Sequence, residues 1–309
     1  MAGCARRAAA VGTVTREVLV VAHTGRHFVR EGVQKVLDQL LAAGIRPRVL
    51  DEEAGRLDLH HASVAHPDKD PAAGAELIVV LGGDGSLLRG AEFARAADVP
   101  LLGINLGHVG FLAEAEPEAL ETTVDRVAHG DYAVEQRMTL DVVVRHEGEV
   151  LYRGWALNEA SIEKARRSRM LDCVLEVEGR PLSRWGCDGV VCATPTGSTA
   201  YAFSAGGPIV WPQVQATLVV PVSAHALFAR PLVLSPDTAV GIEVLPGESS
   251  AVLSCDGRRS FPVSARSRID VSRGSRSIQL VRMDRRPFTD RLVRKFRLPV
   301  EGWRGSGTG

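Results

Sequence analysis

In the first third of the chain, continuous apolar runs alternate with segments whose apolar residues recur at helical spacing. The runs at 18–22 and 77–81 are continuous and rich in Val, which is typical of buried strands in a parallel sheet. Between them, apolar residues from Val29 to Leu41 recur at helical spacing, and Gly44 ends the helix. Further strands are predicted at 48–50 and 100–104, and further helices from Ser86 and over 117–128. This alternation predicts a doubly wound, Rossmann-like α/β domain.

The pattern changes near residue 133. From Val134 to Val144 apolar residues alternate with mostly polar ones, which is typical of a long half-buried strand. Strand-like segments dominate afterwards, with turn signals such as Glu178-Gly179 between neighbours. The predicted strands cover 151–160, 171–177, 190–193, 218–222, 240–245, 251–254 and 278–283. A mostly antiparallel, all-β domain is therefore expected from about Glu135 onward.

These patterns divide the chain into five parts. We expect an α/β nucleotide-binding domain and a β domain, followed by a C-terminal segment that packs back on the first domain, with a disordered stretch at each end. The boundaries are 1–16 for the disordered N-terminus, 17–134, 135–285, 286–300 for the C-terminal segment, and 301–309 for the disordered tail.

Composition limits the classes of partner. The 309 residues suffice for two domains, and 37 basic and 37 acidic residues give a formal net charge of zero. This balance gives no electrostatic reason to expect nucleic acid or an anionic membrane as a partner. No run of about 18 apolar residues occurs, so no membrane span is expected. The basic stretch from Arg282 to Arg297 is expected to be a solvated face.

The cysteines favour a reducing cytoplasm. There are five, the number is odd, and no Cys-x-x-Cys pair occurs. A disulfide framework and a zinc site are therefore not expected. Residues 1–16 lack the apolar stretch of a signal peptide.

The most informative motif is Gly82-Gly83-Asp84-Gly85. It lies between the predicted strand 77–81 and a predicted helix, at the carboxyl end of a parallel strand where open α/β sheets bind ligands. Glycines allow a phosphate chain to approach backbone N–H groups. A carboxylate there would repel phosphate unless it orients a metal or takes a proton from a hydroxyl. The alternative is that Asp84 merely caps the helix.

Two further motifs lie in the β domain. The stretch from Thr194 to Tyr201 is dense in hydroxyls and small residues, and Tyr201 could stack on a base. The alternative is a β-turn followed by a capped helix. Asn158-Glu159 combines an amide with a carboxylate, which suits a ribose diol, although most such pairs are surface residues. Neither the P-loop pattern nor a strict Gly-x-Gly-x-x-Gly after the first strand is present.

In this order, Gly-Gly-Asp-Gly, Asn-Glu, Asp-Gly and Thr-Pro-Thr-Gly-Ser-Thr-Ala-Tyr resemble the motifs of the NAD kinases. The resemblance covers about residues 18–296. It implies an α/β N-terminal domain with a β-sandwich-like C-terminal domain, assembled as homodimers or homotetramers. It also implies ATP-dependent phosphorylation of the 2′-hydroxyl of the adenosine ribose of NAD, giving NADP, with Mg²⁺ or another divalent metal carried mainly by ATP and no metal site of its own.

The resemblance assigns roles position by position. It implies that Asp84 is the general base, that Gly83, Gly85 and Arg89 lie by the phosphates, and that Asn158 and Glu159 bind the substrate ribose. Arg169 would face the dinucleotide and Asp188 would hydrogen-bond its nicotinamide side. The adenine and ribose would be lined by Thr199, Ala200, Tyr201, Ala202, Phe203 and Ser204.

Several points stay open at this stage. Arg89 and Arg169 could be ordinary surface arginines, and the role of Asp256 is not fixed. Ala224 precedes His225 where relatives commonly carry Pro, so His225 is interpreted as structural. The alternatives are a diacylglycerol-type lipid kinase, which would need extra exposed apolar surface, and a non-catalytic NAD(P) sensor. No residue decides between ATP and polyphosphate as donor, and the small Gly186 leaves open whether NADH is also accepted.

Overall fold

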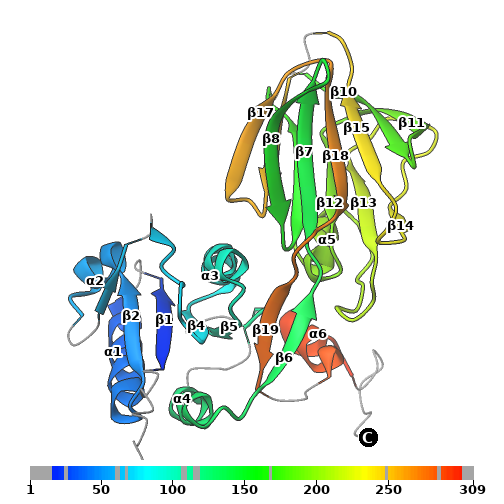
Figure 1. Ribbon diagram of the computed structural model, residues 1–309. Coiled ribbons are helices and arrows are strands. Elements are labelled where there is room, and N and C mark those ends of the chain that lie inside the picture. The colour runs from blue at the N-terminus through cyan, green and yellow to red at the C-terminus, as the bar shows by residue number, and fades with distance from the viewer. Residues whose placement is uncertain are drawn as a thin grey trace, which may run out of the picture.

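The structure is a computed structural model, and it describes residues 16–23, 27–59, 63–66, 69–105, 110–113, 119–166, 169–247, 250–283 and 287–300. The expectations for residues 1–15 and 301–309, and for the start of the helix predicted at Pro117, lie outside the described residues. The chain forms two units, an α/β unit and a unit built almost entirely of strands (Figure 1).

The α/β unit is built on one seven-stranded sheet. Its strand order is β3-β2-β1-β4-β5-β19-β6, and all neighbours are parallel except the pair β19–β6. The strands are β1 (Glu17–Ala22), β2 (Arg46–Leu50), β3 (Ser63–Ala65), β4 (Leu77–Leu81), β5 (Leu101–Ile104), β6 (Ala133–Arg137) and β19 (Ile278–Arg282). All residues of β4 and β5 are buried, as a parallel strand covered on both faces requires.

Helices cover both faces of this sheet. One apolar cluster joins the sheet to α1 (His27–Ala42) and α4 (Leu120–His129), and a second joins the opposite face to α3 (Asp84–Ala97). The short α2 (Asp51–Leu57) follows β2. The α/β fold predicted from the alternating pattern is therefore confirmed, and the apolar face of each helix explains it.

The strand order places a topological switch point between β1 and β4. The chain moves from β1 outward to β2 and β3, and then returns to β4 on the other side of β1. The backbone N–H of His23 donates to the carbonyl of Leu81, so the turns after these two strands touch. Ligands of open α/β sheets bind at such a point.

The β unit is a sandwich of two six-stranded antiparallel sheets. Their strand orders are β11-β10-β15-β18-β7-β8 and β14-β13-β12-β9-β16-β17. One buried cluster around Trp185 fills the space between them. The strands of the first sheet are β7 (Leu140–His146), β8 (Glu149–Ala156), β10 (Leu171–Val177), β11 (Arg180–Cys187), β15 (Val240–Val244) and β18 (Ser267–Arg273). Those of the second are β9 (Glu159–Lys164), β12 (Gly189–Ala193), β13 (Thr217–Val222), β14 (Leu232–Leu234), β16 (Ala251–Cys255) and β17 (Arg259–Val263).

The structure corrects three strand predictions. The alternating stretch 134–144 is two strands in different sheets, and 151–160 is likewise divided between β8 and β9. The segment 278–282, expected in the β domain, is β19 and pairs with β5 and β6 in the α/β sheet. Residues 135–137 belong to that sheet as well. The period of two identifies strands but does not reveal which sheet they join.

The C-terminal helix α6 (Phe288–Phe296) lies between the two units (Figure 1). The Phe111 ring of the α/β unit lies 6.2 Å from Phe288 and 5.6 Å from Phe296. From the β unit, the Phe203 ring lies 4.7 Å from that of Phe296, and the Trp211 ring lies 5.3 Å from that of Phe288. The helix therefore joins both units through aromatic contacts.

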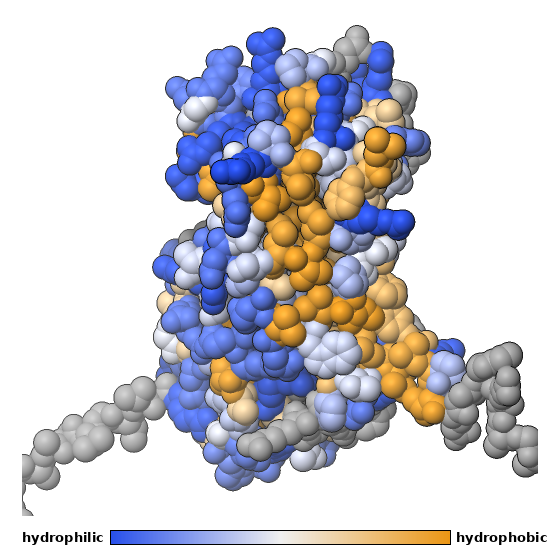
Figure 2. Space-filling view, turned by 90° about the vertical axis from the view of Figure 1, so that its right-hand side faces the viewer, coloured by the Kyte–Doolittle hydropathy of each residue, from blue (hydrophilic) through white to orange (hydrophobic). Residues whose placement is uncertain are grey.

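One face of the molecule carries a band of apolar side chains. Figure 2 shows it on the side that bears β11, β14 and α6 in Figure 1. Exposed large apolar residues on or beside these elements are Leu182, Leu227, Phe228, Val233 and Leu298. A contiguous apolar band of this kind marks an interaction surface.

Candidate active site

Asp84 is held at the switch point by a neighbouring loop. It is the first residue of α3, whose N-cap is Gly83, so the alternative that Asp84 caps this helix is not supported. Instead, one carboxylate oxygen accepts the backbone N–H of Phe111 at 3.1 Å and the other accepts that of Leu112 at 3.2 Å. These bonds fix the direction of the carboxylate and leave each oxygen able to accept one more proton donor.

The glycines beside Asp84 differ in their surroundings. A Cβ at Gly83 or Gly85 would meet nothing within 4 Å, so the backbone there is open to a ligand. A Cβ at Gly82 would lie 2.6 Å from Ser86 Oγ, and one at Gly110 would lie 2.3 Å from Asp84 Oδ1. Gly82 and Gly110 are therefore needed for close packing around the carboxylate, whereas Gly83 and Gly85 leave room above it.

Arg89 forms a partly buried ion pair with Glu53 of α2. Its Nη1 lies 2.7 Å from Glu53 Oε1, and its Nη2 lies 3.8 Å from Glu52 Oε2. The other Glu53 oxygen accepts the N–H of Ala22 at the end of β1, at 2.9 Å. Burial raises the pKa of Glu53 to about 7, although these partners favour the carboxylate. Arg89 is therefore more than an ordinary surface arginine, and Glu53 is a residue that the sequence analysis missed.

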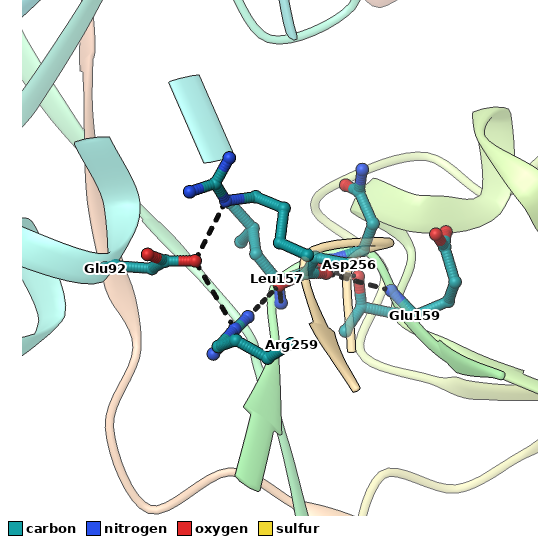
Figure 3. Close-up of polar contacts among 8 residues, drawn as sticks. Glu92, Leu157, Glu159, Asp256 and Arg259 are labelled. Atoms are coloured by element: carbon teal, nitrogen blue, oxygen red, sulfur yellow. Dashed lines mark hydrogen bonds and ion pairs between the residues drawn. The ribbon is translucent and has the colours of Figure 1, made fainter. Parts of the chain in front are cut away.

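Asp256 organises the turn that carries Asn158 and Glu159. Its carboxylate accepts the backbone N–H groups of Leu157, Asn158 and Glu159, and an Nη2 bond from Arg259 at 2.6 Å (Figure 3). Asp256 and Gly257 both have positive φ, 56° and 65°, as an Asp-Gly hairpin turn requires. Asp256 therefore shapes the turn.

The turn that carries Asn158 and Glu159 packs against the α/β unit near the switch point. Leu157 is buried in the same cluster as Leu87 and Leu112, which flank Asp84 on α3 and on the loop. Glu92 of α3 also pairs with Arg258, in the turn after β16, at 2.9 Å and with Arg259, at the start of β17, at 3.4 Å (Figure 3). These contacts bring the turn with the Asn-Glu pair against helix α3, which begins at Asp84, across the boundary between the two units.

Two buried oxygens at the turn have no hydrogen-bond partner among the residues that the structure describes. They are Asn158 Oδ1 and Glu159 Oε2, and both are almost inaccessible to solvent. Burial, with the nearby Asp256 carboxylate adding to it, raises the pKa of Glu159 to about 7. Unpartnered buried acceptors cost free energy, so they are retained where a ligand supplies the missing donor.

Most hydroxyls of the Thr194–Ser198 stretch serve the fold. Thr194 Oγ1 donates to the Leu157 carbonyl at 2.6 Å and accepts the Gly197 N–H. Ser198 Oγ bridges the Pro195 carbonyl and Val210. A Cβ at Gly197 would lie 2.1 Å from the Asn158 carbonyl oxygen. The Thr194–Ser198 stretch therefore holds the turn at Asn158 in place.

The following residues remain more accessible. Tyr201 and Thr199 are half-buried, Phe203 is exposed, and Ala202 is fully buried in a small cluster with β12 and β13. Tyr201 begins the short helix α5 (Tyr201–Ser204), after the 3₁₀ turn Thr196–Thr199. Burial raises the pKa of Tyr201, with acidic neighbours adding to the rise. The backbone N–H of Tyr201 also favours the Glu159 carboxylate, so the start of α5 lies beside this residue.

Asp188 and Arg169 lie farther along the β unit. The ammonium of Lys164, in β9, donates a hydrogen bond to Asp188 and lowers the pKa of that carboxyl below its usual value, with Ser223 and His225 contributing. Lys164 is a second residue that the sequence analysis did not identify. Arg169 lies on the connection from β9 to β10, next to Met170, which approaches Gly186 of β11.

The described residues contain no group of three or more His, Cys, Asp and Glu side chains placed to hold a metal ion. Among them, no helix is long and apolar enough to cross a membrane. Within the same residues, Cys173, Cys187, Cys192 and Cys255 are buried free thiols.

Comparison with known proteins identifies the family. The model of the ATP-NAD kinase N-terminal domain matches residues 18–132, and that of the ATP-NAD kinase C-terminal domain matches residues 157–283. The chain belongs to the NAD kinase family. An NAD kinase from Thermobifida fusca is 56% identical over 302 residues, which cover 95% of this chain and 93% of that protein. An "NAD kinase 2" from Streptomyces avermitilis is 53% identical and covers 95% and 98% of the two chains.

Solved NAD kinase structures share the fold. An Archaeoglobus fulgidus NAD kinase in complex with ATP has a TM-score of 0.68 and 25% identity over 91% of this chain and 98% of its own. Yeast NADH kinase complexed with NADH has a TM-score of 0.85 over 94% and 89%, and its 22% identity supports the fold alone. The predicted NAD kinase fold, an α/β domain followed by a β sandwich, is confirmed.

Proposed function

We propose that this protein transfers the γ-phosphoryl group of ATP to the 2′-hydroxyl of the adenosine ribose of NAD, giving NADP and ADP. The observation that carries the proposal is the juxtaposition of Asp84 with the Asn158-Glu159 turn across the two units, in a chain that belongs to the NAD kinase family. Kinases of this kind need a base beside the acceptor hydroxyl and a site that positions the acceptor sugar.

In this mechanism Asp84 takes the proton of the 2′-hydroxyl as that oxygen attacks the γ-phosphorus. The bond from the γ-phosphorus to the bridging oxygen of ADP breaks, and Asp84 returns its proton to solvent. The Phe111 and Leu112 N–H groups hold the carboxylate in place for this step. A positioned base of this type contributes about 10²–10⁴-fold to the rate.

The remaining residues bind the two substrates. The open backbone at Gly83 and Gly85, with Arg89 one turn later, would hold the phosphates. The unpartnered oxygens of Asn158 and Glu159 would accept the ribose hydroxyls of NAD. The residues from Thr199 to Ser204 would line the adenine and its ribose, Arg169 would face the dinucleotide, and Asp188 would bind its nicotinamide side.

The phosphate oxygens of ATP would hold a divalent cation, Mg²⁺ or another of its class, which would supply neutralisation of the charge on the transferred group. We further propose a reducing cytoplasm as the setting, supported by the free thiols. A second copy of the chain is proposed to cover the apolar band of Figure 2, giving a homodimer or homotetramer, which light scattering would test.

A coupled assay tests the reaction. The protein is incubated with NAD, Mg²⁺ and ATP, and NADP is detected by a dehydrogenase specific for the 2′-phosphate. Polyphosphate replaces ATP in a parallel reaction, and diacylglycerol replaces NAD in another. NADP formed from ATP supports the proposal. Phosphorylation of the lipid instead, or binding of NAD without transfer, would contradict it in favour of one of the two alternatives.

A further inference from the structure

The loop segment Gly110–Ala113 is bound from two sides. On one side, its N–H groups at Phe111 and Leu112 donate to the Asp84 carboxylate. On the other side, Arg291 of α6 donates from Nη1 to the carbonyls of Phe111 and Ala113, at 3.0 and 3.3 Å. The same short segment therefore connects the C-terminal helix to the acidic group of the Gly-Gly-Asp-Gly turn.

The Gly110–Ala113 segment is closely packed on both sides. A Cβ at Gly110 would lie 2.3 Å from Asp84 Oδ1, so the backbone already touches the carboxylate. On the opposite flank, a Cβ at Gly103 of β5 would lie 3.1 Å from the Cα of Ala113. Leu112 is buried between them in the cluster of α3. A closely packed segment transmits a displacement instead of absorbing it.

Helix α6 reaches the dinucleotide side as well. Phe296 contacts Phe111 at 5.6 Å and Phe203 of α5 at 4.7 Å between ring centroids. Phe288 contacts Phe111 at 6.2 Å and Trp211 at 5.3 Å. The aromatic face of α6 therefore sets the distance between the Asp84 loop and the residues proposed to line NAD.

We propose that Arg291 is a positioning residue for phosphoryl transfer, acting on Asp84 through the Gly110–Ala113 segment. This inference rests on the proposed function, because it assigns Asp84 the role of base. Arg291 supplies a charged donor to the carbonyl of the Phe111–Leu112 peptide, whose N–H binds Asp84, and to the carbonyl of Ala113, the next residue. It thereby fixes one of the two peptide groups that aim the carboxylate and the segment that follows it. Without it, the segment keeps the aromatic contacts of Phe111 with Phe288 and Phe296 on that side, which are not hydrogen bonds to its backbone.

The effect should fall on kcat. Misplacement of a reacting group by about 1 Å costs about 10²-fold in rate. Arg291→Gln is therefore expected to lower kcat by about 10- to 100-fold while the KM values for NAD and ATP change less than about threefold. Arg291→Lys retains a charged donor and should recover most of the loss. Arg297→Gln, which removes the same charge from an exposed residue just after the helix, should behave as the wild type.

A double-mutant cycle separates this role from general structural support. If Arg291 acts through Asp84, Arg291→Gln should lower the residual single-turnover rate of Asp84→Asn by less than about threefold. An equal loss in both backgrounds would overturn the proposal, as would a normal kcat in Arg291→Gln.

A second measurement needs no activity. Amide hydrogen exchange at Phe111 and Leu112 should speed up at least tenfold in Arg291→Gln, and not in Arg297→Gln, while the strands of the β sandwich keep their protection. Unchanged exchange at both amides would overturn the positioning link even if the protein proved not to phosphorylate NAD. Faster exchange in Arg291→Gln, combined with a wild-type protein that forms no NADP, would instead refute the proposed function and leave the link standing.

Discussion

Glu53, a carboxylate with no solvent exposure, lies 2.7 Å from Nη1 of Arg89 and ties this arginine to the end of β1. Arg89→Gln should lower the free energy of unfolding by about 2 kcal/mol at pH 8, because it leaves a buried carboxylate oxygen unpaired. The loss should shrink below pH 6, where Glu53, whose pKa is about 7, is protonated. Urea denaturation at the two pH values measures this.

Two variants control for this effect. Glu53→Gln/Arg89→Gln should recover most of the stability, since no buried charge remains, yet it should keep a raised KM for ATP if Arg89 binds phosphate. Arg56→Gln breaks an exposed pair with Glu52 and should cost less than about 0.5 kcal/mol. An Arg89→Gln protein as stable as the wild type at pH 8 would contradict the pairing.

Glu159 should make stability depend on pH. Its pKa is about 7 in the folded protein against 4.5 for the ordinary group, so the folded state holds more protons between these values. Its contribution to stability is therefore fully present below about pH 4.5 and declines as the pH rises to about 7. Glu159→Gln removes this decline. The stability difference, variant minus wild type, should grow by up to about 3 kcal/mol between pH 4 and pH 8.

The same variant should bind NAD more weakly, since the carboxylate is proposed to accept a ribose hydroxyl. Greater stability with weaker binding is expected where a site keeps an unfavourable buried charge for its ligand. Parallel stability profiles of wild type and variant from pH 4 to pH 8 would show that Glu159 does not titrate in this range.

Gly197 should be irreplaceable because of its contact with Asn158. A Cβ there would lie 2.1 Å from a backbone carbonyl oxygen, so Gly197→Ala must displace the Asn158-Glu159 turn. We expect Gly197→Ala to lower the free energy of unfolding by about 1–3 kcal/mol and to raise the KM for NAD at least tenfold. Gly55→Ala is the matched control, because its Cβ would meet nothing within 4 Å and its helix should gain about 0.5–1 kcal/mol. Similar behaviour of the two variants would refute this account.

Gly186 bears on the choice between NAD and NADH. A Cβ there would make only ordinary contacts, 3.5 Å to Met170 Cε and 3.6 Å to Asp172 Oδ1, so the site has room beside β11. We therefore expect NADH to be accepted, with kcat/KM within about tenfold of that for NAD. Parallel assays with each dinucleotide would measure the ratio, and a strong bias against NADH would contradict the expectation.

The sequence predicted the local parts of the site well. The strand 77–81, the glycine turn and the helix after it are encoded by neighbouring residues, and the structure has them as β4 and α3. The Asn-Glu pair is weak by itself, and it could be identified together with the more specific Thr-Pro-Thr-Gly stretch because these motifs follow one another as in the NAD kinases. The fold class could be predicted from the alternation of strands and helices in the first unit and from the period of two in the strands of the second.

The rest depends on contacts between distant residues. Nothing in the sequence near Glu53, Lys164 or Arg291 indicates a partner 24 to 180 positions away. Strand β19 has an ordinary buried period, so its place beside β5 could not be predicted. The Asp256-Gly257 dipeptide does predict a tight turn, but not that its carboxylate accepts three N–H groups of another turn.

The central claim is that Asp84 acts as the general base, and the most direct test is to measure both kcat and the affinity for NAD of Asp84→Asn. Asp98→Asn, the same change at the exposed C-cap of the same helix, is the control. If Asp84 takes the 2′-hydroxyl proton, Asp84→Asn should bind NAD within about threefold of the wild type by calorimetry and lose about 10²–10⁴-fold in kcat. Turnover of Asp84→Asn at the rate of Asp98→Asn would contradict the account.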